Sequence, residues 1–392
     1  MSARAPLRLA MVGGGPGSFI GPVHRMAAEL DGRIRLVAGV FSRDPAKNAA
    51  AADGWGVARD RIYPDHHAMI AAERARSDGA DLVAVVTPNH LHFDVSAAAL
   101  RGGLHVISDK PATLNLAQAK ELAEIVTASG KLYALTYTYT GYPMVREARE
   151  IVARGDLGAV RKVVVEYSQG WLSRPLEREG NKQADWRSDP AQSGVGGCIG
   201  DIGVHAFNIA EFLTGRRVEH LCADVATVVP GRNLDDDCNV LLRFEGGARG
   251  VLIASQISAG ARNGLKISVY GETGGLTWSH ERHTELTLDW LDAPSQVLHA
   301  GSAYLGAGAQ AVTRIPTGHP EGFIEAFANI YRDFADAIEG QGSGLVPDIA
   351  EGVRGMAFVE RAVAASRSDA GWVALATSPA QPGWATQEGE GR

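Results

Sequence analysis

The chain has 392 residues and a formal net charge of −7 at pH 7. This length exceeds the size of one ordinary hydrophobic core, so it predicts two domains. The acidic balance argues against a nucleic-acid-binding protein. No apolar run reaches the roughly 20 residues that span a bilayer, which argues against an integral membrane protein.

Cysteine usage and the N-terminal residues bear on the compartment. Cys198, Cys222 and Cys238 are odd in number and form no C-x-x-C pair. This usage is typical of a reducing compartment and argues against both a disulfide framework and a structural zinc site. The chain enters its first strand without an apolar signal region, so we expect a cytoplasmic protein.

Strand and helix patterns alternate through the first third of the chain. We expect strands at residues 7–12, 34–41, 82–87, 105–108 and 133–138, and helices at 23–30, 45–52, 65–75, 91–101 and 116–129. Such alternation predicts an α/β domain, residues 1–139, that is built on a doubly wound parallel sheet.

The pattern changes after residue 139. We expect helices at 144–154, 202–213, 323–339 and 349–366, and strands at 160–167, 218–229, 239–244, 250–258 and 265–270. Alternating apolar and polar residues in these strands predict an α+β domain, residues 140–376, on a large, mostly antiparallel open sheet. Residues 377–392 are rich in Gly, Pro, Gln and Glu, so we expect them to be disordered.

A glycine-rich turn follows the first expected strand. Glycines let the backbone approach a pyrophosphate, and the helix that follows offers free N–H groups, so the turn predicts a dinucleotide site. Gly13 and Gly15 match the pattern G-x-G-x-x-G, whose third place falls on Ser18; Gly21 fills that place only in a turn three residues longer. A glycine-rich turn of another fold is the alternative. The residues that we expect at the cofactor here are Gly13, Gly14, Gly15, Ser18, Phe19 and Ile20.

The end of the second strand bears on the choice of cofactor. A dinucleotide site usually places an acid here for the ribose hydroxyls, but this chain has Ser42 and Arg43. A small polar residue beside an arginine tolerates a 2′-phosphate, so both NAD and NADP remain open. Asp44 is a second candidate for the ribose, and a plain surface turn before a helix is the alternative.

Polar residues also follow the next two strands, at the edge of the sheet where ligands bind. Asn89 and His92 are candidate cofactor contacts, or Asn89 caps a helix instead. Lys110 precedes Pro111, which favours an extended conformation and directs the lysine away from the strand end. A desolvated ammonium there stabilises a developing alkoxide; a solvated surface lysine is the alternative.

Asp201 and His205 stand four residues apart at an expected helix start, so they share one face. Such a pair suits general-base chemistry on a hydroxyl, because imidazole titrates near neutral pH. A capping aspartate beside a half-buried histidine is the alternative. Further ligands at zinc spacing are absent from this segment.

Several aromatic and basic residues lie in stretches with a loop-like pattern. Aromatic faces stack on sugar rings, and arginine binds hydroxyls or phosphate. Core packing and structural ion pairs are the alternatives. These residues are Trp171, Trp186, Arg187, Trp278 and His319.

The glycine turn, Asp109-Lys110-Pro111 and Asp201-Ile-Gly-Val-His205 together resemble the Gfo/Idh/MocA oxidoreductases, over about residues 7–373. In that family a Rossmann strand is followed by E-K-P, and a helix carries G-G-x-x-x-D-x-x-x-H. Residues 140–143, 183–190 and 318–323 look like the branch that contains inositol and sugar dehydrogenases.

The resemblance implies that Lys110 contacts the reacting hydroxyl, that Asp201 orients the substrate and that His205 is the general base. Asp109 replaces the family's usual Glu, which bonds the nicotinamide ribose, and is one methylene shorter. The cofactor contacts implied are Ser42, Arg43, Thr87, Pro88, Asn89, His92, Asp109, Lys110, Trp186 and Arg187. The substrate contacts implied are Lys110, Tyr139, Tyr142, Gln169, Arg187, Asp201, His205 and His319.

The function implied is an NAD(P)-dependent dehydrogenase that oxidises a ring hydroxyl of a cyclic polyol or sugar, such as scyllo-inositol or an aldose, to the ketone or lactone. Ser42 stands where NAD-using inositol dehydrogenases often carry Asp, which weakens the choice of NAD over NADP. The alternatives are an NAD-dependent glycosidase of the same fold and a non-catalytic regulator, which would be expected to lose Lys110 and His205.

The resemblance also implies an assembly. A large sheet with one face uncovered by helices exposes apolar surface unless a second copy packs on it. We therefore expect a dimer or tetramer formed through the C-terminal sheet. His319 would then serve its own active site or that of a neighbouring subunit.

Overall fold

The computed structural model describes residues 5–375. Their contacts divide the chain into two compact units. Unit 1 contains residues 5–136 and 330–354, and unit 2 contains residues 137–329 and 355–375. The segment 377–392, for which we expect disorder, lies outside the described residues.

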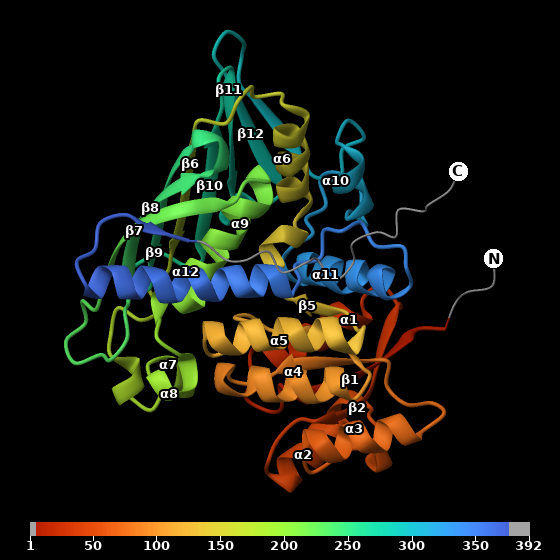
Figure 1. Cartoon of the computed structure of the whole chain (residues 1–392). Coiled ribbons are helices and arrows are strands. Elements are labelled where there is room, and N and C mark those ends of the chain that lie inside the picture. Colours follow the sequence, from red (N-terminus) through yellow and green to blue (C-terminus); the bar gives the residue numbers. More distant parts are fainter. Residues whose placement is uncertain (1–4, 376–392) are drawn as a thin grey trace. The chain divides into compact units, whose positions relative to one another are not determined.

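Unit 1 is built on a parallel sheet of five strands in the order β2-β1-β3-β4-β5 (Figure 1). This confirms the predicted α/β class and parallel sheet. In chain order its elements are β1 Leu7–Gly13, α1 Ile20–Glu29, β2 Ile34–Val40, α2 Pro45–Trp55, α3 His66–Ala75, β3 Leu82–Val86, α4 His92–Arg101, β4 His105–Ser108, α5 Leu116–Ser129 and β5 Tyr133–Leu135.

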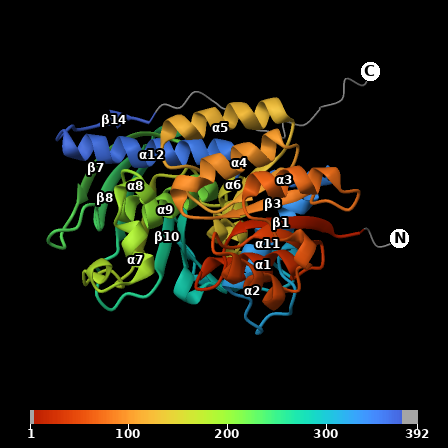
Figure 2. The same cartoon turned by 90° about the horizontal axis from the view of Figure 1, so that it is seen from below.

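Helices cover this sheet on both faces. Figure 2 shows α4 and α5 on one face and α1 on the other. All five residues of β3 are buried, as expected for a central strand of a covered parallel sheet. The strand order reverses between β1 and β3, and in such sheets the crevice at this switch point receives the ligand.

Unit 2 is built on a nine-stranded sheet in the order β13-β12-β11-β10-β6-β9-β8-β7-β14. Only the β6–β9 pair is parallel, which confirms the predicted large and mostly antiparallel sheet. Its strands are β6 Lys162–Ser168, β7 Val218–Ala226, β8 Asp237–Phe244, β9 Arg249–Ser255, β10 Gly264–Tyr270, β11 Gly274–Ser279, β12 Glu285–Trp290, β13 Gln296–His299 and β14 Val373–Ala374.

Two helices of unit 2 pack against this sheet. α9 contacts β6, β9 and β10, and α6 contacts β11 and β12. α9 is buried around almost its whole circumference, so it forms part of the core of the unit. The helices of this unit are α6 Pro143–Arg154, α7 Lys182–Arg187, α8 Pro190–Ser193, α9 Val204–Thr214 and α10 Ala307–Ala311.

Two longer helices, α11 Phe323–Ile338 and α12 Ile349–Arg367, have residues in both units. Within residues 5–375, no helix is both long and apolar enough to span a bilayer.

Some expected elements differ from the observed ones. β5 ends at Leu135 rather than at residue 138, because the chain winds into a 3₁₀ turn at Thr138–Gly141. The strands β11 to β13 were not expected from the sequence. Trp278 lies in β11 and is fully buried. The loop expected around Trp278 is therefore wrong, and core packing accounts for this residue.

Candidate functional site

The turn after β1 has backbone contacts that only glycine permits. Gly13 has a φ of +91°, and a Cβ there would lie 2.4 Å from the carbonyl oxygen of Val86 at the end of β3. A Cβ on Gly15 would lie 2.2 Å from the carbonyl oxygen of Phe41, just after β2. The turn therefore packs, backbone to backbone, against the ends of both neighbouring strands.

Gly21, in the first turn of α1, makes the third close approach. A Cβ on Gly21 would lie 2.0 Å from the carbonyl oxygen of Gly14, so the helix touches the turn directly. The Ser18 hydroxyl accepts a hydrogen bond from the Gly21 N–H at 3.2 Å. Gly21 thus has the packing role of the third fingerprint glycine, and the turn is the longer of the two forms considered. Phe19 is 71% exposed.

The residues after β2 lead directly into helix α2. The Asp44 Oδ1 accepts hydrogen bonds from the N–H groups of Ala46 and Lys47 and caps α2. The Ser42 hydroxyl accepts from the Asp44 N–H at 3.1 Å, and Arg43 is exposed. Asp44 therefore has the capping role, and Ser42 and Arg43 remain the candidates for the ribose end of a cofactor.

His92 is a buried link between two strand ends. Its Nδ1 lies 2.7 Å from the carbonyl oxygen of Pro111, and its Nε2 lies 2.8 Å from that of Thr87. Burial lowers the pKa of His92. Asn89 is buried at the start of the short 3₁₀ turn Asn89–Leu91 that precedes α4. The Thr87 Oγ1 is buried and has no hydrogen-bond partner in the structure.

Asp109 and Lys110 follow β4. The Asp109 Oδ1 accepts hydrogen bonds from the Lys110 N–H at 2.8 Å and from the Thr136 hydroxyl at 3.1 Å. Its Oδ2 lies 4.0 Å from Nε2 of His24, a buried residue of α1. Lys110 is half-buried, and its peptide bond to Pro111 is cis. Two hydrogen bonds thus hold the Asp109 carboxylate within unit 1.

In unit 2, Asp201 lies in a π-helical segment, Ile199–Gly203, that leads into α9. Such segments occur frequently at functional sites. The Asp201 Oδ2 accepts a hydrogen bond from the Gln256 Nε2 at 2.8 Å, and the Arg187 Nε lies 3.4 Å away from the same oxygen. The Asp201 carboxylate thus lies between the side chains of Gln256 and Arg187.

His205 lies one turn further along, in α9, and is 9% exposed. Tyrosine rings surround its imidazole. The ring centroids of Tyr139, Tyr137 and Tyr167 lie 5.0, 5.6 and 6.3 Å from that of His205, the first two edge-on. These rings restrict the orientation of the imidazole and exclude water from most of its surface.

Tyr139 and Tyr142 belong to a hydrogen-bonded network around Asn263. The Tyr167 hydroxyl and the Gln169 Nε2 donate to the Asn263 Oδ1 at 2.6 and 2.8 Å, and the Asn263 Nδ2 donates to the Tyr139 hydroxyl at 3.1 Å. Burial raises the pKa of both Tyr139 and Tyr142, so both hydroxyls stay neutral.

Besides Tyr137, the sequence analysis missed four residues of this region. They are Tyr167, Gln256, Asn263 and His280, whose Nε2 lies 3.0 Å from the Tyr142 hydroxyl. Three of them lie in or next to strands that a periodic pattern already explains, so nothing in the sequence distinguishes them from sheet residues.

Arg187 ends α7 and faces two aromatic rings. Its guanidinium lies 4.1 Å from the ring centroid of Trp186 and 6.0 Å from that of Trp171. Its Nη1 donates to the Gln183 Oε1 at 2.6 Å. His319 is exposed and lies 3.3 Å from the carbonyl oxygen of Pro316. Arg187 is thus oriented toward Asp201, whereas His319 has no contact with Asp201 or His205 among the described residues.

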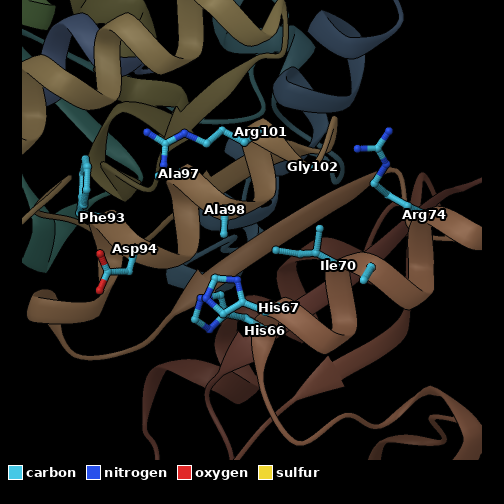
Figure 3. Close-up of a pocket in the computed structure, with 11 residues that line it drawn as sticks. His66, His67, Ile70, Arg74, Phe93, Asp94, Ala97, Ala98, Arg101 and Gly102 are labelled. Carbon is cyan, nitrogen blue, oxygen red and sulfur yellow. The ribbon is translucent and has the colours of Figure 1, made fainter.

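A hollow of about 600 Å³ lies elsewhere in unit 1, between α3 and α4. Figure 3 shows His66 and His67 side by side in it, with Asp94 on the neighbouring helix. None of the residues proposed from the sequence lines this hollow. Within residues 5–375, no group of three or more His, Cys, Asp or Glu side chains is arranged to hold a metal ion.

Comparison with known families identifies both parts of the chain. Residues 7–137 match the model described as "Oxidoreductase family, NAD-binding Rossmann fold", and residues 145–277 match the "GFO/IDH/MocA C-terminal domain". The chain belongs to the Gfo/Idh/MocA family. It is therefore an oxidoreductase with an NAD-binding Rossmann domain, and the glycine contacts and the unpartnered Thr87 hydroxyl fit a bound dinucleotide.

Individual members of the family are similar over almost the whole chain. The uncharacterized oxidoreductase YfiI of Bacillus subtilis is 33% identical over 379 residues, which cover 94% of this chain and 96% of YfiI. An inositol dehydrogenase homolog from Azotobacter vinelandii, solved with NAD⁺, is 38% identical in sequence and has a TM-score of 0.91. The match covers 95% of this chain and 98% of the homolog's chain. An inositol dehydrogenase homolog from the same organism, solved with NADH and myo-inositol, is 37% identical and has a TM-score of 0.87. This match covers 94% of this chain and 97% of that homolog's chain.

Proposed function

We propose that the protein is an NAD-dependent dehydrogenase that oxidises a ring hydroxyl of a cyclic polyol or sugar, such as an inositol or an aldose. The observation that carries this proposal is the pairing of Asp201 with His205 on successive helical turns, with Arg187 beside the carboxylate and tyrosines around the imidazole. The similarity to a protein solved with NADH and myo-inositol supports the choice of substrate class.

In this proposal His205 removes the proton from the substrate hydroxyl, because a neutral imidazole is a suitable base near neutral pH. Asp201 accepts a hydrogen bond from the substrate and orients it. Lys110 stabilises the negative charge that develops on the hydroxyl oxygen. NAD⁺ when bound accepts the hydride.

The cofactor contacts in this proposal come from the turn at Gly13–Gly15, from the ends of β2 and β3, and from Asp109. We assign residues 1–139 to cofactor binding and residues 140–376 to substrate binding and assembly. Tyr139, Tyr142 and Gln169 bind the substrate or shape the surface around it, and His319 serves its own or a neighbouring active site. Because Ser42 replaces the expected acid, NADP remains a second cofactor to test.

A panel of inositols and aldoses tests the proposal, with NADH or NADPH formation followed by absorbance. We expect turnover of at least one cyclic polyol or aldose with NAD⁺. Release of nitrophenol from nitrophenyl glycosides without net NADH formation would favour a glycosidase instead. Tight NADH binding without turnover of any panel member or glycoside would contradict both enzymatic functions.

A further inference from the structure

Gln256 contacts Asp201 from a different part of unit 2. It follows β9 directly and is 2% exposed. Its Nε2 donates to the Asp201 Oδ2 at 2.8 Å, and the Arg187 Nε lies 3.4 Å from that same oxygen. A hydrogen bond to a carboxylate is stronger than one between neutral groups, so the Gln256 amide restrains the rotation of the Asp201 carboxylate, and Arg187 is its ion-pair partner.

The backbone of Gln256 is held on both sides. Its N–H donates to the carbonyl oxygen of Asp236 at 2.9 Å, and its carbonyl oxygen accepts from the N–H of Leu172 at 3.1 Å. The side chain therefore extends from a fixed position. Such a side chain can impose an orientation on its partner instead of adapting to it.

The turn before β8 bonds to the backbone of Gln256 through Asp236, and it bonds to the segment before Asp201 through Asp235. The Asp235 carboxylate accepts hydrogen bonds from the N–H groups of Gly197 and Ile199 at 2.6 and 2.8 Å. A Cβ on Gly197 would lie 2.3 Å from the carbonyl oxygen of Asp235, so the two backbones are in direct contact. Asp235 and Asp236 are adjacent, and together they fix the spacing between Gln256 and Asp201.

We infer that Gln256 is a positioning residue, which orients the Asp201 carboxylate for the substrate hydroxyl without itself contacting the substrate. This inference rests on the proposed function, in which Asp201 binds the substrate. Arg187 alone does not define the orientation, because its Nε lies further from the carboxylate and its guanidinium also bonds Gln183 and stacks on Trp186.

The variant Gln256→Met tests this inference, because methionine has a similar length and no donor. We expect kcat/KM for the polyol to fall about 10- to 100-fold, the range for losing a hydrogen bond to a charged group. The KM for NAD⁺ and the affinity for NADH should stay unchanged, since among the described residues Gln256 contacts none of Gly13, Gly15 and Asp109, the cofactor residues of the proposed function, which lie in unit 1. The matched control is Gln296→Met, at an exposed position on β13 where Gln296 accepts from the Trp290 Nε1, and its kcat/KM should stay within about twofold.

A crystal structure of Gln256→Met provides a second readout that needs no activity. We expect the fold to be retained and the Asp201 carboxylate to rotate toward Arg187. An unchanged carboxylate, an unchanged kcat/KM for the polyol or a parallel rise in the KM for NAD⁺ would each overturn the inference. If the wild-type protein oxidises no polyol, the proposed function fails and the carboxylate's orientation alone decides the role of Gln256. If Gln256→Met does not fold, Gln256→Leu takes its place with the same expected outcomes, because leucine also has no donor.

Discussion

The backbone around Lys110 is held in place by hydrogen bonds from neighbouring residues. Asp109 accepts the Lys110 N–H, His92 bonds the carbonyl oxygen of Pro111, and the Thr136 hydroxyl bonds Asp109. The backbone on each side of Lys110 is thus fixed by buried or half-buried groups. Such support is what a side chain needs in order to stabilise charge in a transition state.

Replacing Lys110 tests its role directly. We expect Lys110→Ala to reduce polyol-dependent NADH formation by about 100-fold or more, because the charge on the hydroxyl oxygen would lose its stabilising ammonium. NADH binding, measured by fluorescence, should persist. Lys120→Ala, an exposed position on α5, is the control and should behave as the wild type does. Near-normal turnover by Lys110→Ala would remove Lys110 from the mechanism.

His24 makes the stability of unit 1 depend on pH. It is fully buried, and its Nδ1 lies 2.7 Å from the Tyr331 hydroxyl. Burial lowers the pKa of His24 from 6.5 to about 4, despite the opposing charge of Asp109, and His92 lowers it further. Between these values the unfolded chain binds a proton that the folded chain excludes. Stability is therefore fully present above pH 6.5 and is lost as the pH falls toward 4.

We expect His24→Gln to reduce this pH dependence, because the amide does not titrate and still accepts from the Tyr331 hydroxyl. The lowering of the His24 pKa corresponds to a loss of about 3 kcal/mol of unfolding free energy between neutral pH and pH values below the folded-state pKa. Urea unfolding of the wild type and the variant above pH 6.5 and near pH 4 measures the difference. The exposed His67→Asn is the control, and equal pH dependence in wild type and His24→Gln would contradict the assignment.

Among the secondary-structure elements, β1, the glycine turn and α1 meet in a closely packed junction. A Cβ added at Gly13, Gly15 or Gly21 would lie within 2.4 Å of a backbone oxygen. The helix start therefore lies directly on the turn, with its first N–H groups at the edge of the sheet. This arrangement suits a pyrophosphate, because Gly13, Gly14 and Gly15 have no side chains that would keep a phosphate away from the backbone of the turn.

A methyl group at Gly21 tests this junction. We expect Gly21→Ala to weaken NADH binding and to destabilise unit 1 by about 1–3 kcal/mol, because the new Cβ would push α1 off the turn. Gly54→Ala is a matched control in α2, where no atom lies within 4 Å of the added Cβ. That control should be neutral or slightly stabilising, since alanine favours helices. Unchanged NADH affinity and stability in Gly21→Ala would contradict the close packing.

At the scale of the whole molecule, strands β6, β8 and β9 of the nine-stranded sheet have one buried face and one partly exposed face among the described residues. Leu241 on β8 pairs with Val251 on β9, and Val251 pairs with Val164 on β6. These three side chains point away from the buried residues of their strands, and Leu241 is 47% exposed. They form an apolar stripe across three strands, which supports the proposal that this face packs against a second copy.

A charge in this stripe tests the assembly. We expect light scattering to give the mass of a dimer or tetramer for the wild type, and a monomer or smaller assembly for Leu241→Asp, because a buried, unpaired carboxylate opposes association. Leu291→Asp is the control, since Leu291 is 77% exposed in the turn after β12. An unchanged mass for Leu241→Asp, or a monomeric wild type, would place no interface at this stripe.

The sequence was sufficient to predict the classes of both sheets, because strand and helix periodicities are local patterns. They can be recognised without knowing which segments pack against one another. The glycine turn, the Lys-Pro dipeptide and the Asp201–His205 spacing were visible for the same reason. Whether Gly21 or Ser18 completes the turn depended on the path of the backbone in three dimensions.

The partners of the polar side chains required the tertiary structure. Gln256 and Asp201 are 55 positions apart in the chain, and His24 and Tyr331 are 307 positions apart. Each pair forms only when strand register and helix packing are fixed, and a glutamine after a strand or a histidine on a helix carries no local mark of its partner. Local patterns therefore define elements and motifs, whereas the orientation of a reactive carboxylate depends on contacts between distant segments.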